Sequence, residues 1–326
     1  MTTTVETDLL VIGAGPAGLF ATYYAGFRGL RVAVVDSLPE LGGQVTAMYP
    51  EKQIFDVAGF PSIKGRDLVE GLVSQAASAK PDYFLDRTAR TLVHTENAVT
   101  VGLDDGTEIT AGAVLITAGI GKFSPRPLPG GEEWLGRGLE FFVPSFAPYA
   151  GKDVVIVGGG DSAFDWALHL EPIAGSVTLV HRRDAFRAHE RSVEQVRASR
   201  VQILTRAQVS GIHGNAHVEQ VEVTVAGEDR PRVLPAQAIV AALGFLADLG
   251  PLQQWGIAVS KRHVVVDAAM RTTLPRVFAA GDITEYAGKV RLIAVGFGEA
   301  ATAVNNAAVT IDPTAHVFPG HSSESG

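Results

Sequence analysis

The clearest chemical signal in this chain is a glycine turn, Gly13-Ala14-Gly15-Pro16-Ala17-Gly18. In a turn of this pattern the first glycine permits the tight bend and the second lets the backbone approach a pyrophosphate. The third lets the following helix pack against the preceding strand. The helix N-terminus then offers free N–H groups and the positive end of its dipole to the phosphates. The turn therefore predicts a dinucleotide site.

Asp36 adds a second feature to that turn. It follows the apolar run 31–35, and the turn itself follows a similar run at 8–12. An acid placed about 20 residues after such a turn can accept hydrogen bonds from the ribose hydroxyls of an adenosine without a 2′-phosphate. Strand, turn, helix, strand and acid together favour a dinucleotide site over a plain buried turn. They predict FAD or NAD as its occupant.

The same unit recurs in the middle of the chain. Residues 153–157 are strand-like, and Gly158-Gly159-Gly160-Asp161-Ser162-Ala163 forms a second phosphate turn in which alanine replaces the third glycine. His181 lies at the same spacing from Gly160 as Asp36 does from Gly15. An internal repeat of a dinucleotide-binding unit predicts two nucleotides in one chain.

The second copy carries positive charge where the first carries its acid. His181-Arg182-Arg183 occupies that place, and Arg187 follows. A carboxylate there would repel a 2′-phosphate, whereas arginines pair with it through charge-assisted, often bidentate hydrogen bonds. A solvated basic face is the alternative interpretation. The matched register favours NADP(H) at the second turn.

The composition limits the possible chemistry. The 326 residues, 46% of them hydrophobic, suffice for two domains with ordinary cores. A net charge of −8 argues against nucleic-acid binding, and we expect no membrane span and no export signal, hence a cytoplasmic protein. The 326 residues include no cysteine, which excludes disulfide exchange, thiolate catalysis and cysteine-held iron–sulfur clusters within them. We assign no residue to a metal.

Further segments must position these sites. Residues 67–80 predict an amphipathic helix, and 99–101 and 108–110 predict strands joined by a turn. The segments 201–204, 217–225 and 233–242 are expected to complete one second sheet. Residues 277–282 predict a strand that ends in Gly281-Asp282, where a carboxylate can meet a ribityl or phosphate-side group of a flavin. A final helix is expected to open at Gly296.

These features together resemble the thioredoxin-reductase-like flavoproteins over nearly the whole chain. The resemblance implies that the first turn and Asp282 hold FAD, and that the second turn and the stretch 181–188 hold NADPH. Thioredoxin reductases carry a Cys-x-x-Cys pair just before the second turn. Here residues 141–146 read Phe-Phe-Val-Pro-Ser-Phe, so a self-contained thioredoxin reductase is excluded.

A closer resemblance is to the ferredoxin–NADP reductases built on this scaffold. It rests on Tyr49-Pro50-Glu51-Lys52, on the stretches 56–61, 158–168, 181–189 and 296–300, and on the tail His321-Ser322-Ser323. It implies that Tyr49 stacks on one flavin face. It also implies a homodimer in which the tail, through His321, covers the other face of the flavin in the second subunit.

The turns and the resemblance together define two sets of candidate residues. The FAD set is Gly13, Gly15, Gly18, Asp36, Gln44, Tyr49, Ala89, Phe123, Gly281, Asp282, His321 and Ser323. The NADP(H) set is Gly158, Gly160, Asp161, Ser162, His181, Arg182, Arg183 and Arg187. The flavin would perform the chemistry, so no side chain is assigned as a catalytic acid or base.

The predicted fold is α/β, with two Rossmann-like dinucleotide-binding domains of the three-layer ββα type, one inserted in the other. The FAD domain would be discontinuous, 1–119 plus 247–326, and the NADP(H) domain would be 120–246. Residues 121–131, rich in Gly and Pro, suggest a linker. Two chain crossings, near 119–121 and 244–246, would permit one domain to rotate against the other.

The implied activity is FAD-dependent electron transfer between NADPH and a one-electron carrier, ferredoxin or flavodoxin. Two alternatives stay open at this point. An NADPH-dependent flavin oxidase or quinone reductase would have the same two sites and a different acceptor. A non-enzymatic dinucleotide sensor would bind NADPH but reduce its flavin slowly.

Overall fold

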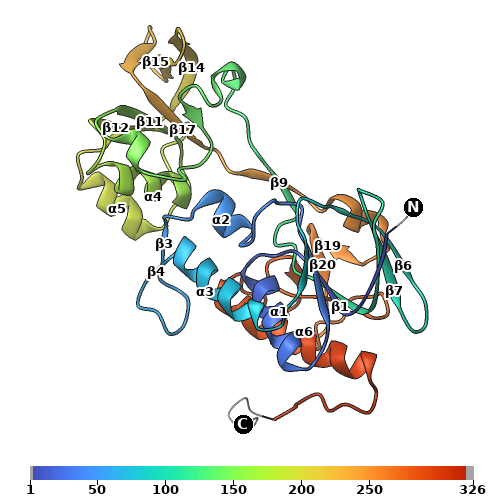
Figure 1. The fold of residues 1–326 in the computed structure, drawn as a ribbon. Helices are drawn as coiled ribbons and strands as arrows, with labels where there is room; N and C mark the ends of the chain where they lie inside the picture. Colours follow the sequence, from blue (N-terminus) through green and yellow to red (C-terminus); the bar gives the residue numbers. More distant parts are fainter. Residues whose placement is uncertain (1–2, 321–326) are drawn as a thin grey trace. The chain divides into compact units, whose positions relative to one another are not determined.

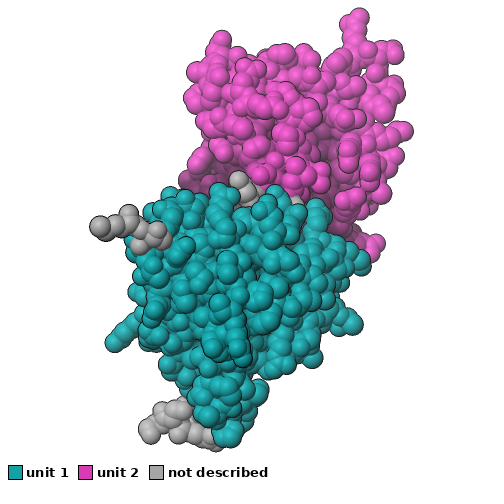
Figure 2. Space-filling model, turned by 90° about the vertical axis from the view of Figure 1, so that its right-hand side faces the viewer, with its two compact units in different colours: residues 1–123, 247–326 teal, residues 124–246 magenta. Residues whose placement is uncertain are grey.

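The chain folds into two compact units. The computed structural model describes residues 3–320. The first unit combines residues 1–123 with 247–326, and the second comprises residues 124–246 (Figure 2). The chain crosses between them in β9 (Lys122–Pro125) and β18 (Phe245–Asp248), which pair as a two-stranded sheet. The first division therefore falls at 123 rather than at 119, because part of the Gly- and Pro-rich segment is a paired strand.

A seven-stranded sheet forms the centre of the first unit (Figure 1). Its path runs β5-β2-β1-β8-β7-β6, and β21 also pairs with β8. The bounds are β1 (Thr4–Ile12), β2 (Val32–Val35), β5 (Asp82–Phe84), β6 (Ala89–His94), β7 (Val99–Leu103), β8 (Glu108–Ile116) and β21 (Val277–Ala279). β1 is parallel to β2 and β8, whereas β6, β7 and β8 form an antiparallel meander. β2 and the C-terminal parts of β1 and β8 are buried apolar runs because both of their faces are covered.

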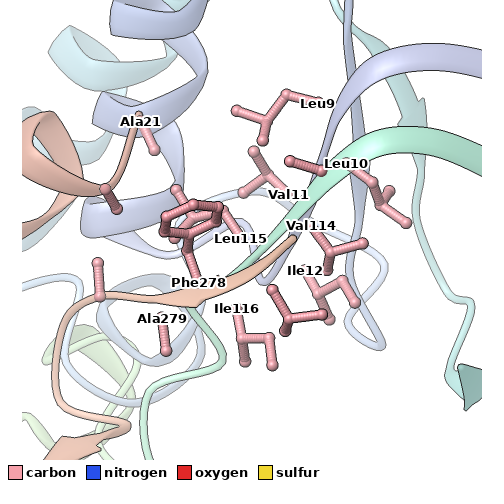
Figure 3. Close-up of a cluster of buried hydrophobic side chains, with 14 of the residues drawn as sticks. Leu9, Leu10, Val11, Ile12, Ala21, Val114, Leu115, Ile116, Phe278 and Ala279 are labelled. Atoms are coloured by element: carbon pink, nitrogen blue, oxygen red, sulfur yellow. The ribbon is translucent and has the colours of Figure 1, made fainter. Parts of the chain in front are cut away.

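Three helices of this unit pack together, with α1 (Pro16–Phe27) against α3 (Gly65–Ala77) and α6 (Ile293–Ile311). Small buried residues on α1, such as Ala21, let α1 lie close to the sheet, where Phe278 fills the space beside Leu115 (Figure 3). Burying a side chain the size of Phe278 contributes about 1.5–3 kcal/mol. The last helix begins at Ile293 rather than at Gly296, so Gly296 lies within its first turns.

Shorter elements complete the first unit. They are α2 (Gln44–Met48), β3 (Gln53–Ile54), β4 (Ile63–Lys64), β19 (Val259–Ser260), β20 (His263–Val265), β22 (Thr284–Glu285) and the 3₁₀ turn η3 (Gly250–Gln254). Among residues 3–320, no helix combines the length and the apolar character needed to cross a membrane.

The second unit contains a five-stranded parallel sheet in the order β10-β17-β11-β12-β13. Its strands are β10 (Leu139–Glu140), β17 (Ala238–Ala242), β11 (Asp153–Gly158), β12 (Ser176–Val180) and β13 (Gln202–Leu204). The unit also contains α4 (Asp161–Leu170), α5 (Glu190–Arg197) and the 3₁₀ turns η1 (Glu132–Trp134) and η2 (Ala147–Tyr149). Strand, glycine turn and helix therefore follow one another here as they do in the first unit.

The expectation that three segments complete one second sheet was wrong in part. β13 and β17 join the parallel sheet, but β14 (Ala207–Gly214), β15 (Val218–Val225) and β16 (Arg232–Pro235) form a separate antiparallel sheet. In β15 the side chains of Val218, Val221 and Val223 are buried and the polar residues between them are more exposed, whereas almost all of β17 is buried. An alternating strand suits an antiparallel sheet with one face in solvent, and a buried strand suits the centre of a parallel sheet.

Candidate functional site

The first glycine turn has the geometry that its three glycines predict. Gly13 has φ +112°, and a Cβ added there would lie 2.6 Å from the Thr117 carbonyl oxygen. A Cβ at Gly18 would lie 1.8 Å from the Gly13 oxygen. At Gly15, by contrast, an added Cβ meets no atom within 4 Å. The outer glycines are thus required by packing, and the middle one borders open space into which a phosphate fits.

The N-terminus of α1 lies at this open position. Gly15 is its N-cap residue, Pro16 is its first residue, and no side chain caps it. The first free N–H groups of the helix therefore keep their hydrogen-bonding capacity. A pyrophosphate placed at Gly15 would meet these donors and the positive end of the helix dipole.

Asp36 is held against the turn by backbone donors. Its carboxylate accepts hydrogen bonds from the Ala14 N–H at 2.6 Å and from the Leu38 N–H at 2.8 Å. Burial raises the pKa of this carboxyl group, and the backbone N–H donors oppose that rise. Because the carboxylate is fixed before any ligand binds, its remaining lone pairs can accept bonds from ribose hydroxyls.

A cavity of about 630 Å³ runs along the turn within the first unit. This volume lies inside the range of about 300–1,000 Å³ that is usual for ligand sites. Its lining brings together eight of the predicted FAD residues: Gly13, Gly15, Asp36, Gln44, Tyr49, Ala89, Gly281 and Asp282. Gly18 does not line it, since that glycine packs beneath the turn.

Three predicted FAD residues receive no side-chain account. Phe123 lies in β9 at the end of the first unit's N-terminal segment, and its side chain is not described. His321 and Ser323 lie outside the described residues. These assignments stay predictions.

Tyr49 is held at the end of α2 by tight backbone packing. Its carbonyl oxygen accepts a hydrogen bond from the Lys52 N–H at 3.1 Å, and a Cβ added to Gly65 would lie 2.7 Å from that oxygen. Burial raises the pKa of the Tyr49 phenol to about 12, and the charges of Asp282 and Asp56 add to the rise. The cavity therefore presents an uncharged aromatic ring near the carboxylate of Asp282, and the stacking role of Tyr49 stays a prediction.

Apart from Ala89, the residues of one wall of the cavity were not predicted. Residues 87–90, at the start of β6, and residues 248–252 with Trp255, from the segment that returns from β18, line it. Trp255 joins these two segments, because its Nε1 donates a hydrogen bond to the Arg90 carbonyl oxygen at 3.0 Å. Thr117 was also missed, although its Oγ1 donates to the Gly13 oxygen at 2.7 Å. Only the unusual tryptophan was a signal in the sequence.

The second glycine turn repeats the design of the first. A Cβ at Gly158 would lie 2.5 Å from the Ala242 oxygen, whereas one at Gly160 meets nothing within 4 Å. Gly160 is the N-cap residue of α4, again with no side-chain cap. Asp161, the first residue of α4, accepts a hydrogen bond from the His189 N–H at 2.8 Å, and Ser162 is exposed beside it.

His181 packs against this second turn. A Cβ at Gly159 would lie 2.2 Å from the His181 ring, and Nε2 of His181 lies 3.2 Å from the Ala185 oxygen. Burial lowers the pKa of His181. The Arg187 N–H also donates to the Gly159 oxygen at 2.7 Å. His181 thus supports the turn through its ring and contributes no fixed positive charge.

The guanidinium groups near this turn are available to an anion. Arg182, Arg183 and Arg187 are exposed, and none forms an ion pair with another residue in the described range 3–320. Nearby Asp184 is engaged instead with Arg206, at 3.5 Å. Residues of this unit therefore combine an open glycine, a helix N-terminus and free arginines, as a phosphorylated dinucleotide requires.

Comparison with known proteins decides the family. Residues 7–307 match the family Pyridine nucleotide-disulphide oxidoreductase. The chain belongs to this family. It is 80% identical to a ferredoxin–NADP reductase of Nocardioides sp., over 98% of both chains. It is 62% identical to a ferredoxin–NADP reductase of Frankia alni, over 97% of this chain and 98% of the relative.

A solved structure agrees with this placement. The T. acidophilum thioredoxin reductase has a TM-score of 0.80 and 25% identity, covering 93% of this chain and 98% of that one. The predicted fold class and the resemblance to ferredoxin–NADP reductases are thus confirmed. The chain is an oxidoreductase of this group, whose cofactors are FAD and NADP(H). Unlike thioredoxin reductases it has no cysteine with which to reduce a disulfide.

Proposed function

We propose that this protein moves electrons between NADPH and ferredoxin through FAD bound in the cavity of the first unit. One observation carries the proposal: both glycine turns keep an open middle glycine, in a chain that has no cysteine. When bound, FAD would accept two electrons from NADPH and release them one at a time to the carrier. The names of the relatives at 80% and 62% identity support ferredoxin as that carrier.

The first unit's residues bind and orient the cofactor in this proposal. The N–H groups at the start of α1 receive the pyrophosphate at Gly15, and Asp36 receives the adenosine ribose. The neutral ring of Tyr49 provides a stacking surface, and Asp282 receives a hydroxyl of the ribityl chain. No side chain of the cavity needs to transfer a proton, so the task of the protein is placement and exclusion of water.

The second unit's residues select the coenzyme. Gly160 and the N-terminus of α4 would hold the pyrophosphate of NADPH. Arg182, Arg183 and Arg187 would pair with its 2′-phosphate, the group that distinguishes NADPH from NADH. His181 would hold the turn in shape without itself carrying charge, which refines the role that the sequence suggested for it.

The C-terminal tail and the assembly remain predictions. Within the described residues, Arg28 donates hydrogen bonds to the carbonyl oxygens of His316 at 2.8 Å and Val317 at 3.4 Å. These bonds hold residues 316–317 against Arg28 at the end of α1. We propose in addition that the protein is a homodimer in which His321 and Ser323 of one subunit cover the flavin of the other. We also propose flavodoxin as a second carrier and a cytoplasmic location.

The test compares electron acceptors and donors under the same conditions. We expect faster steady-state reduction of ferredoxin than of quinone or oxygen, and faster turnover with NADPH than with NADH. Quinone or oxygen reduction that equals ferredoxin reduction would instead support a quinone reductase or flavin oxidase. A slow loss of flavin absorbance at about 450 nm after mixing with NADPH would support a dinucleotide sensor.

A further inference from the structure

A buried ion pair lies beside the Gly281-Asp282 corner of the cavity, and no cofactor assignment uses it. The side chains of Lys289 and Glu299 are 2% and 5% exposed, and Lys289 Nζ lies 2.5 Å from Glu299 Oε1. Burying an ammonium and a carboxylate is costly unless further hydrogen bonds satisfy both groups. The hydrogen-bond partners of Lys289 and Glu299 therefore indicate the role of the pair.

Two of those hydrogen bonds lead to the backbone N–H and carbonyl oxygen of Gly281. Glu299 accepts a hydrogen bond from the Gly281 N–H at 2.7 Å. Lys289 donates to the Gly281 carbonyl oxygen at 3.0 Å, and Thr284 Oγ1 donates to the same oxygen at 2.8 Å. The Tyr286 hydroxyl donates to Glu299 at 2.5 Å, and Thr284 Oγ1 lies 3.4 Å from the same carboxylate. Both sides of one glycine are thus held by a charged side chain.

Gly281 is a point where a small rotation would matter. Its φ of +82° is in the left-handed region, and a Cβ there would lie 3.2 Å from the Ala17 Cβ in α1. A Cβ on Gly296 of α6 would lie 3.4 Å from the Gly281 Cα. The next residue, Asp282, lines the cavity and is only partly exposed. The orientation of Gly281 therefore determines where the Asp282 carboxylate points.

We propose that Lys289 and Glu299 are positioning residues for FAD: their ion pair clamps Gly281 and so fixes Asp282 in the cavity. The inference rests on the proposed function in taking FAD as the ligand. Neither Lys289 nor Glu299 is among the described residues that line the cavity, so the pair reaches it through hydrogen bonds to Gly281 and through the action of its charges on Asp282. Lys289 comes from the loop after β22 and Glu299 from α6, so the pair joins two segments of the first unit at Gly281.

The experiment measures FAD binding separately from folding. The full-length chain with Lys289→Met loses one clamp and leaves Glu299 buried without its cation, and Glu299→Gln does the reverse. FAD affinity of the apoprotein is titrated by flavin fluorescence, the midpoint potential of the bound flavin is measured, and thermal unfolding is followed without FAD. We expect the dissociation constant of Lys289→Met to rise at least tenfold and the midpoint potential to shift, with partial recovery in Lys289→Arg.

A matched control separates positioning from stability. Val304→Ala removes methyl groups from the core face of the same helix, at a fully buried position outside the cavity lining. It should lower the melting temperature and leave the FAD dissociation constant within twofold of the parent. Lys289→Met is compared with this control after correction for its own loss of melting temperature. If its FAD dissociation constant also stays within twofold of the parent, the pair is merely structural and the proposal is overturned.

Two further results are decisive. If Lys289→Met does not fold, Tyr286→Phe tests the same network with the ion pair intact. It should weaken FAD binding twofold or more, and unchanged affinity there would overturn the proposal. If the parent apoprotein itself takes up no FAD, it is the proposed function that fails. If the parent binds FAD and the variants bind it with the same affinity, only the positioning inference fails.

Discussion

Gly15→Ala and Gly18→Ala should have opposite consequences, although both add a single methyl group to the same turn. At Gly15 the new Cβ meets nothing within 4 Å, and the backbone φ of −73° suits any residue. Alanine is a less favourable N-cap than glycine, which destabilises the folded protein, but it lowers the entropy of the unfolded chain, which stabilises the folded protein. Because these effects oppose each other, the stability of the apoprotein should change by less than about 1 kcal/mol. The methyl group would instead occupy the space of the pyrophosphate.

The expected cost of Gly15→Ala appears in FAD binding. Losing one charge-assisted bond between backbone and phosphate costs about 1.5–3 kcal/mol, which raises the dissociation constant about tenfold to a hundredfold. Gly18→Ala should destabilise the apoprotein itself by about 1–3 kcal/mol or more, since its Cβ would lie 1.8 Å from the Gly13 oxygen.

Thermal unfolding without FAD and a fluorescence titration with FAD measure the two effects separately. Gly160→Ala is the matched variant in the second unit, where the middle glycine is equally open, and it should weaken NADPH binding while FAD binding stays unchanged. Parental FAD affinity in Gly15→Ala, or a parental melting temperature in Gly18→Ala, would refute the steric reasoning.

Three other predictions address different parts of the molecule. Changing Arg182 and Arg183 together to Ala should raise KM for NADPH at least tenfold and barely affect NADH; an unchanged KM for NADPH removes the 2′-phosphate assignment. The phenol of Tyr49, with its pKa near 12, stays protonated in the folded protein after an unfolded tyrosine ionises near pH 10, so the unfolding free energy should fall between about pH 10 and 12. Tyr49→Phe should make that fall shallower by up to about 1.4 kcal/mol per pH unit, which denaturant titrations would detect. Truncation after Phe318 should leave folding and most FAD binding intact but change ferredoxin turnover or oxygen reactivity, and identical rates would assign the tail no role.

Both glycine turns were predictable because their information is local. At each site a strand, a turn with three small residues and a helix follow one another directly in the sequence. A glycine at a crowded position or in the left-handed region has few substitutes. The positions of Asp36 and of the arginines after β12 relative to the turns were predictable for the same reason, since one strand–helix–strand unit sets that spacing, and their roles toward the nucleotides stay predictions. The missing cysteines excluded disulfide chemistry without any structure.

Other features depend on residues that are distant in the sequence. Whether β15 or β17 joins the parallel sheet depends on which strand each one meets, and apolar content alone did not separate them. The cavity wall at Trp255 forms only where the returning chain meets β6. The packing of the His181 ring over Gly159 also could not be read from the spacing, and the expected contact of His181 with a nucleotide stays a prediction. The pairing of Lys289 with Glu299 likewise depends on the packing of α6, which brings Glu299 beside Gly281 and Lys289. Once buried, the two charged groups must find hydrogen-bond partners inside the protein, and both bond to Gly281.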